Sequence, residues 1–412
     1  MDTLRSFVAG IKSFLEKNDK SEVNTKIWSK PDGVSEIYET RRLTLSASRN
    51  RPTTDFYEFY WAHNMRNTSF ADTSLWLWKL ITTSPKKIPQ RLHGLWYTIW
   101  GLMLMIICAI FIIFGVQQIK SLFAALIAIP FVLTLFGLAQ KYFAGVFLSF
   151  AGDAARYFTP IPSNIEERNK IRQQGVNFLK KLHEKDYDRI VLVGHSLGSV
   201  IAYDLLRLLW AEYHDTYEKH PTVNQDLLKE INRLSLHPEQ LTDIDAFQNL
   251  QYRCWMQQKE TGNKWLVSDL VTLGAAVCCA DYFMVSLVPF SELAKEKEYP
   301  VCPPVTDINR PDIASESRTY DIPGGQKRTV KILHHAALFA ITRWTNIFFK
   351  SDFVGSEACR LFGKGVMDVT IPRRSLWFLP GGHTNYWDKE SSASLEAIAR
   401  ALRLREDSNP EV

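Results

Sequence analysis

The segment at residues 188–206 constrains the fold of this chain more than any other. An apolar run at residues 190–193 leads into the pentapeptide GHSLG at residues 194–198, and a helical pattern of apolar residues follows. A strand that turns sharply into a helix at a serine between two glycines is a nucleophile elbow. We expect both glycines to be needed because side chains two residues from the serine would crowd the turn. The alternative is an ordinary strand-to-helix turn.

On this elbow, and on the late stretch GHTNYW at residues 382–387, the chain resembles the α/β-hydrolase superfamily. The resemblance implies a mostly parallel sheet flanked by helices. It also implies that the elbow serine, Ser196, is the nucleophile and that an acid and then a histidine follow it in the sequence. A resemblance at this level supports a reaction class and does not identify a substrate.

The resemblance places the catalytic base in a late loop, and His383 lies in such a loop before a predicted final helix at residues 391–403. His334 and His335 are alternatives, but both lie in an apolar run at residues 330–340 that we predict to be a helix or a mixed segment. We expect those two histidines to be structural.

The acid is expected at the end of a strand between the elbow and His383. Asp352 follows the strand-like run at residues 344–349 and precedes a turn that contains glycine. The 31 residues from Asp352 to His383 leave room for one helix and one strand. Asp281, Asp368 and Glu357 are the alternatives, and an aspartate at a strand end can simply cap a helix.

An acyl-transfer site also needs an oxyanion hole, and the backbone N–H of Leu197 is the expected first donor. The second donor normally comes from a loop after an early strand, often marked His-Gly. The only His-Gly pair before the elbow, at residues 93–94, follows no predicted strand. We therefore expect Met1 to be an internal methionine preceded by a strand and a His-Gly loop. The alternative is a divergent or inactive site.

Two uncharged runs predict a transmembrane hairpin at residues 95–140. The first run, residues 95–116, has 22 residues, and the second covers residues 121–138. A helix of about 20 apolar residues spans a hydrocarbon core of about 30 Å. The alternative is a buried helical pair in a soluble core. Basic residues flank the hairpin and one lies in its turn: Lys79, Lys86, Lys87, Arg91, Lys141 and Arg156 flank it, and Lys120 is in the turn.

The excess of basic residues outside the hairpin, compared with its turn, predicts a multi-pass membrane protein with a cytoplasmic catalytic domain, in the inner membrane if the source is bacterial. Six cysteines without CxxC spacing indicate neither a zinc site nor a disulfide framework. We expect no cofactor, no metal and no nucleic-acid partner; the expected partners are the bilayer and a lipid or acyl-ester substrate.

The predicted fold class is α/β, with a hydrolase-like sheet interrupted by the hairpin and by a helical insertion that acts as a cap or lies on the surface. The domain boundaries are 1–94 and 141–210 for the hydrolase parts before and after the hairpin, 95–140 for the hairpin, 211–262 for the insertion, and 263–412 for the remainder. Ser196, Asp352 and His383 then predict a membrane-anchored serine hydrolase that cleaves an ester or thioester. The alternative is a non-catalytic membrane protein that keeps the scaffold for binding.

Overall fold

The computed structural model describes most of the chain outside its central apolar segment. The described residues are 2–35, 37, 39–65, 149–159, 161–217, 226–279, 290–305, 314–322, 325–352, 354–372 and 381–404, with single residues and short stretches between 78 and 134. Among these residues, no helix combines the length and the apolar character that a bilayer crossing requires. The predicted hairpin at residues 95–140 lies largely outside the described residues and stays a prediction.

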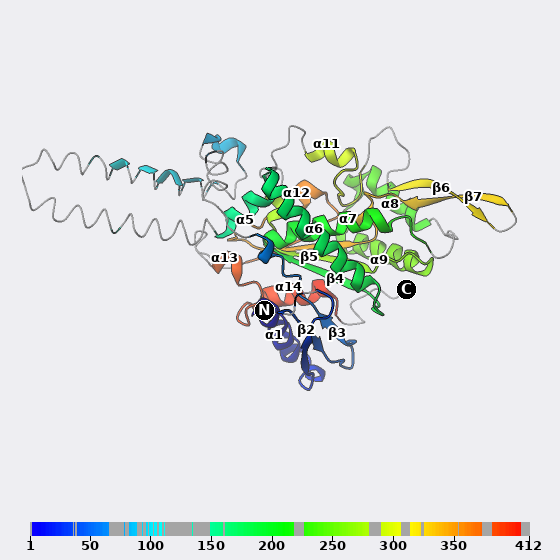
Figure 1. Ribbon diagram of the computed structural model, residues 1–412, viewed down its shortest axis with the longest axis horizontal. Coiled ribbons are helices and arrows are strands. Elements are labelled where there is room, and N and C mark those ends of the chain that lie inside the picture. The colour runs from blue at the N-terminus through cyan, green and yellow to red at the C-terminus, as the bar shows by residue number, and fades with distance from the viewer. Residues whose placement is uncertain are drawn as a thin grey trace, which may run out of the picture.

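A parallel sheet of four strands forms the centre of the molecule (Figure 1). Its order is β4 (Ile190–His195), β5 (Val267–Leu273), β8 (Arg343–Phe349) and β9 (Met367–Ile371). Every residue of β5 and β8 is buried, as expected for interior strands that are covered on both faces. The strand-like runs at residues 190–193 and 344–349 are therefore strands, and β5 lies between them as a parallel neighbour of both.

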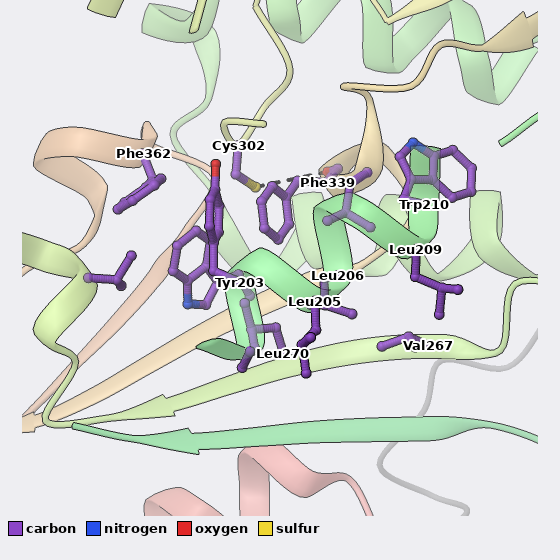
Figure 2. Close-up of a cluster of buried hydrophobic side chains, with 14 of the residues drawn as sticks. Tyr203, Leu205, Leu206, Leu209, Trp210, Val267, Leu270, Cys302, Phe339 and Phe362 are labelled. Carbon is purple, nitrogen blue, oxygen red and sulfur yellow. Dashed lines mark hydrogen bonds between the residues drawn. The ribbon is translucent and has the colours of Figure 1, made fainter. Parts of the chain in front are cut away.

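Helices cover both faces of this sheet, as the α/β prediction requires. The α-helices are α1 (Asp2–Asn18), α5 (Ser149–Phe158), α6 (Pro162–His183), α7 (Leu197–Tyr213), α8 (Asp226–Leu236), α9 (Ile244–Glu260), α11 (Phe290–Lys295), α12 (Cys359–Phe362), α13 (Gly381–Thr384) and α14 (Ser392–Leu402). Apolar residues of α6, α7 and α9 share one core cluster, and those of α1 and α14 share a second cluster. Figure 2 shows Leu205, Leu206 and Leu209 of α7 above Val267 and Leu270 of β5.

Two smaller antiparallel sheets complete the described chain. One contains β1 (Ile27–Pro31), β2 (Arg41–Leu45) and β3 (Thr54–Phe56), and the other is the projecting ribbon of β6 (Ser315–Ile322) and β7 (Gln326–Leu333) (Figure 1). The helical or mixed segment predicted at residues 330–340 is wrong in its first part. Val330 and Ile332 are buried while Lys331 is exposed, which is the two-residue period of a strand. A short 3-10 helix, Leu338–Ala340, follows.

The insertion at residues 211–262 is helical, as predicted, but its second helix does not act as a cap. The α9 side chain Gln248 donates a hydrogen bond to the backbone oxygen of Trp344, near the start of β8. Gln251, one turn later, donates to the backbone oxygen of Phe339. These contacts place α9 beside the beginnings of the strands, whereas Ser196 follows the opposite end of β4. Buried apolar residues such as Phe247 explain the position, because they pack into the core beneath the helix.

Candidate active site

Ser196 lies between β4 and α7 in a backbone conformation that few residues adopt. Its φ is 53° and its ψ is −126°, and a positive φ is strained for a residue with a β-carbon. Four hydrogen bonds hold its backbone: its N–H donates to the oxygen of Leu273, and its oxygen accepts from the N–H and the hydroxyl of Ser199 and from the N–H of Ala276. Its side chain is partly exposed. The surrounding structure therefore maintains the strained turn and leaves the hydroxyl accessible.

The two glycines of the elbow differ in what they do. A β-carbon at Gly194 would lie 2.7 Å from the backbone oxygen of Gly198 and from the α-carbon of Ser199, so β4 and α7 can approach only with glycine there. A β-carbon at Gly198 would meet nothing within 4 Å. The prediction that both glycines relieve crowding is therefore wrong for Gly198.

Three predicted side chains form one hydrogen-bonded chain. The Nε2 atom of His383 lies 2.8 Å from the Oγ atom of Ser196. Its Nδ1 atom lies 2.9 Å from Oδ1 and 3.0 Å from Oδ2 of Asp352. Asp352 and His383 are buried, and both side chains are wholly shielded from solvent. The structure thus brings together the residues proposed as nucleophile, base and acid, although their catalytic role stays a prediction.

The environment of Asp352 favours its ionised form. Burial alone would raise the pKa of this carboxyl group, but the nearby His383 and hydrogen bonds from His383, Tyr386 and the N–H of Val354 together lower the pKa below its ordinary value. A carboxylate that accepts several hydrogen bonds keeps its charge despite burial. An ionised Asp352 can hold the Nδ1 proton of His383, which leaves Nε2 free to accept a proton from Ser196.

Gly274 makes room for this carboxylate. It follows β5 with a φ of +52°, and a β-carbon there would lie 2.6 Å from the Oδ2 atom of Asp352. Glycine is therefore required twice over at this position, for its backbone conformation and for the close approach of the acid.

His195, the residue before the nucleophile, supports the loop that carries His383. Its Nε2 atom lies 2.8 Å from the backbone oxygen of His383, and the two rings are 5.0 Å apart between centroids. Burial, and then the neighbouring charge of His383, lower the pKa of His195 to about 4. A neutral His195 with its proton on Nε2 can donate to that backbone oxygen, so it helps to fix the position of His383.

The alternative acids do not reach this site. Asp368 accepts hydrogen bonds from the amide of Asn346 and from the N–H groups of Ala358 and Cys359, and it therefore ties β9 to the start of α12. Glu357 forms a surface ion pair with Arg360. Asp281 lies outside the described residues.

The alternative histidines also have other partners. The Nδ1 atom of His334 accepts a hydrogen bond from the N–H of Ala336, and the ring of His335 lies beside those of His334 and His214. His93 contacts the backbone oxygens of Pro85 and Ile88. Within the described part of the chain, no His, Cys, Asp and Glu side chains cluster in a way that could hold a metal ion.

The described residues include one of the two expected donors of the oxyanion hole, the backbone N–H of Leu197. Leu197 is the first residue of α7, where backbone N–H groups have no acceptor within the helix. The helix dipole also favours negative charge at this end. Among the described strands, β4 pairs with β5 only. The described residues identify no second donor, so the role of Leu197 stays a prediction.

Comparisons of this chain with protein-family models, with curated proteins and with solved structures found no match. Its function is therefore inferred from the geometry of the site.

Tyr386, His195 and Gly274 contribute to the site, yet the sequence assigned them no role. Tyr386 lies in the stretch GHTNYW, three residues after His383. His195 lies in the pentapeptide GHSLG, directly before Ser196. Their proximity to a predicted catalytic residue was the available signal. Gly274 lies inside an apolar run at residues 266–277, and a glycine within a strand pattern indicates close approach by another group.

Proposed function

We propose that this chain is a membrane-anchored serine hydrolase that cleaves an ester or thioester, with lipid-derived acyl compounds as its substrate class. The observation that carries the proposal is the hydrogen-bonded chain from Ser196 through His383 to Asp352, in which each contact is 3.0 Å or shorter. An α/β-hydrolase-like scaffold agrees with the proposal. The nucleophile follows β4, the acid follows β8 and the base follows β9, which is the expected order.

The chemistry follows from this arrangement. His383 takes the Ser196 proton on Nε2 while Oγ forms a bond to the acyl carbon of the substrate. The tetrahedral oxyanion develops beside the start of α7, where the N–H of Leu197 is the expected donor. When the bond to the leaving alcohol or thiol breaks, His383 gives it the proton. Water, activated by His383 in the same way, then releases the acid and restores Ser196.

Membrane anchoring is supported by the sequence and by exposed apolar side chains in the first uncharged run. Four residues, each at least 41% exposed, are spaced by three or four positions: Trp100, Leu104, Ile107 and Phe111. This spacing gives a helix one apolar side. The described parts of this run and α13 lie toward the same end of the long axis of the molecule (Figure 1). A substrate taken from the bilayer would therefore approach the end that carries His383.

The second candidate function is a non-catalytic membrane protein that uses the same scaffold for binding. One observation favours it: residues 191–193 of β4 are partly exposed, whereas the neighbouring β5 is buried throughout. The described residues thus leave one edge of the elbow strand without a paired strand and the oxyanion hole with one identified donor.

Turnover by the purified full-length protein in detergent distinguishes the two functions. We expect hydrolysis within a panel of oxygen esters and thioesters with acyl chains from short to long. Ser196→Ala should abolish it, while Ser163→Ala, at an exposed serine in the first turn of α6, should leave it unchanged. Hydrolysis that survives Ser196→Ala would contradict the role of Ser196, and an inactive wild-type protein across the panel would favour the binding scaffold.

A further inference from the structure

We propose that Tyr386 is a positioning residue for this site and that its hydroxyl holds the charge of Asp352 where His383 needs it. The inference rests on the proposed hydrolase function and adds a residue to its machinery. Tyr386 belongs to the late motif at residues 382–387, of which the mechanism above uses only His383.

The hydrogen bonds of Tyr386 have a fixed direction. Its hydroxyl oxygen lies 3.1 Å from the backbone nitrogen of Phe349, which can only donate. The hydroxyl proton is therefore available for Asp352, whose Oδ2 atom lies 2.5 Å away. The Tyr386 ring is buried and stacked on the Phe349 ring with 4.3 Å between centroids, so the phenol has little freedom to turn elsewhere.

Tyr386 also connects the two loops that must stay in register. Phe349 ends β8 three residues before Asp352, and Tyr386 lies three residues after His383. Two glycine backbones also approach the carboxylate closely: a β-carbon at Gly274 or Gly355 would lie 2.6 or 3.0 Å from Oδ2. The phenol and these glycine backbones together leave the carboxylate one orientation, which is the one that faces His383.

This contact predicts an effect on proton transfer as well as on shape. The titratable groups that face Asp352 are His383 on α13, Tyr386 in the loop that follows, and His195 at the end of β4. The Tyr386 hydroxyl stabilises the Asp352 carboxylate most when His383 is neutral. When His383 is protonated, its positive charge already stabilises the carboxylate. Loss of the phenol hydroxyl therefore destabilises the state with neutral His383 more than the protonated state, and the apparent pKa of the pair rises.

The test compares Tyr386→Phe with a matched removal of a buried tyrosine hydroxyl, Tyr203→Phe. Tyr203 donates to the backbone oxygen of Pro300 at 2.8 Å and lies in the core cluster of Figure 2, away from Asp352. The readout is the second-order rate constant for labelling by a fluorophosphonate probe as a function of pH. This constant refers to each active site and so does not depend on the fraction of protein that is folded.

We expect Tyr386→Phe to lower this rate constant about tenfold or more, the effect of losing one hydrogen bond to a charged group. We also expect the acidic limb of the pH profile of this rate constant to move to higher pH. Tyr203→Phe should change neither the rate constant nor the position of the limb. A rate within about threefold of wild type, or a loss without movement of the limb, would overturn the proposal. A loss shared by both variants would do the same.

If Tyr386→Phe yields no labelled protein, 3-fluorotyrosine at position 386 decides the question. It keeps the ring and makes the phenol a stronger donor, so the limb should move to lower pH. An unmoved limb would contradict the role of Tyr386. Failure of the proposed function looks different, because the wild-type protein would then show no reaction that depends on Ser196.

Discussion

Asp352 and His383 support Ser196 to different degrees, and substitutions should show this. His383→Ala should lower the hydrolysis rate nearly as much as Ser196→Ala because nucleophile and base act as a unit. Asp352→Asn should lose on the order of a thousandfold or more, since the wrong imidazole tautomer is then favoured. Initial rates on the best ester of the panel measure both effects.

The exposed His335 provides the control, and His335→Ala should keep wild-type activity. If His334→Ala or Glu357→Gln proves more damaging than His383→Ala or Asp352→Asn, the assignment of base and acid is wrong.

Histidines with lowered pKa values, His195 and His183 among them, make stability depend on pH. Burial lowers the pKa of both His195 and His183 to about 4, with the charge of His383 as a further cause at His195. An unfolded histidine titrates near 6.5, so the unfolded chain binds more protons between these two values. Stability should be unaffected by these groups above about pH 6.5 and should fall as the pH drops toward 4.

The melting temperature in detergent, measured at pH 7.5 and pH 5, tests this. We expect it to be lower at pH 5, and we expect His183→Gln to reduce the difference. His237→Gln, at an exposed histidine, should leave the difference unchanged. An equal pH dependence in wild type and His183→Gln would show that His183 does not contribute.

At the scale of single residues, the sequence was sufficient where local pattern and chain order carry the information. Ser196, Asp352 and His383 each follow a recognisable strand or precede a recognisable helix. Gly274 and Tyr386 could not be assigned in this way, because their importance depends on contacts between loops that are far apart in the chain. The role expected of Gly198 failed for the same reason: the space around it is set by tertiary packing.

Among the elements, α1 packs against the loop that follows His383. Trp387 packs against the edge of the His195 ring and donates a hydrogen bond from Nε1 to the hydroxyl of Ser6. A β-carbon at Gly10 would overlap the backbone oxygen of Trp387. Helix α1 therefore supports, through Trp387, the loop that follows His383.

Gly10→Ala should separate α1 from this loop. We expect a lower melting temperature and slower fluorophosphonate labelling of the protein that remains folded. Gly33→Ala is the matched control, because a β-carbon there would meet nothing within 4 Å. If Gly10→Ala and Gly33→Ala behave alike, α1 does not support the site.

Runs of apolar residues predicted elements that lie in the core and missed those that are mostly exposed. The helix α14 and the strands β4 and β8 have strong apolar patterns and lie where the sequence placed them. The ribbon of β6 and β7 was missed because most of its residues are polar and exposed, so pairing between its strands replaces burial as the source of order. The cap interpretation failed for α9 because the sequence does not show where a helix docks.

At the scale of the whole molecule, the membrane hairpin is the main prediction that the described residues leave open. The protein should fractionate with membranes and resist extraction by high salt and by carbonate, because two long uncharged runs cannot be exposed to water. A reporter inserted at Lys120 should lie outside the cytoplasm, with reporters at both termini inside. Release into the soluble fraction by salt alone would contradict the hairpin.

The central claim is that Ser196 is a nucleophile activated by His383 and Asp352, and adduct mapping tests it most directly. The wild-type protein is treated with a fluorophosphonate probe, digested, and analysed by tandem mass spectrometry. The account predicts a single stoichiometric adduct on Ser196 that is absent in Ser196→Ala and strongly slowed in His383→Ala. An unlabelled wild-type protein, or an adduct on another residue with Ser196 unmodified, would contradict it.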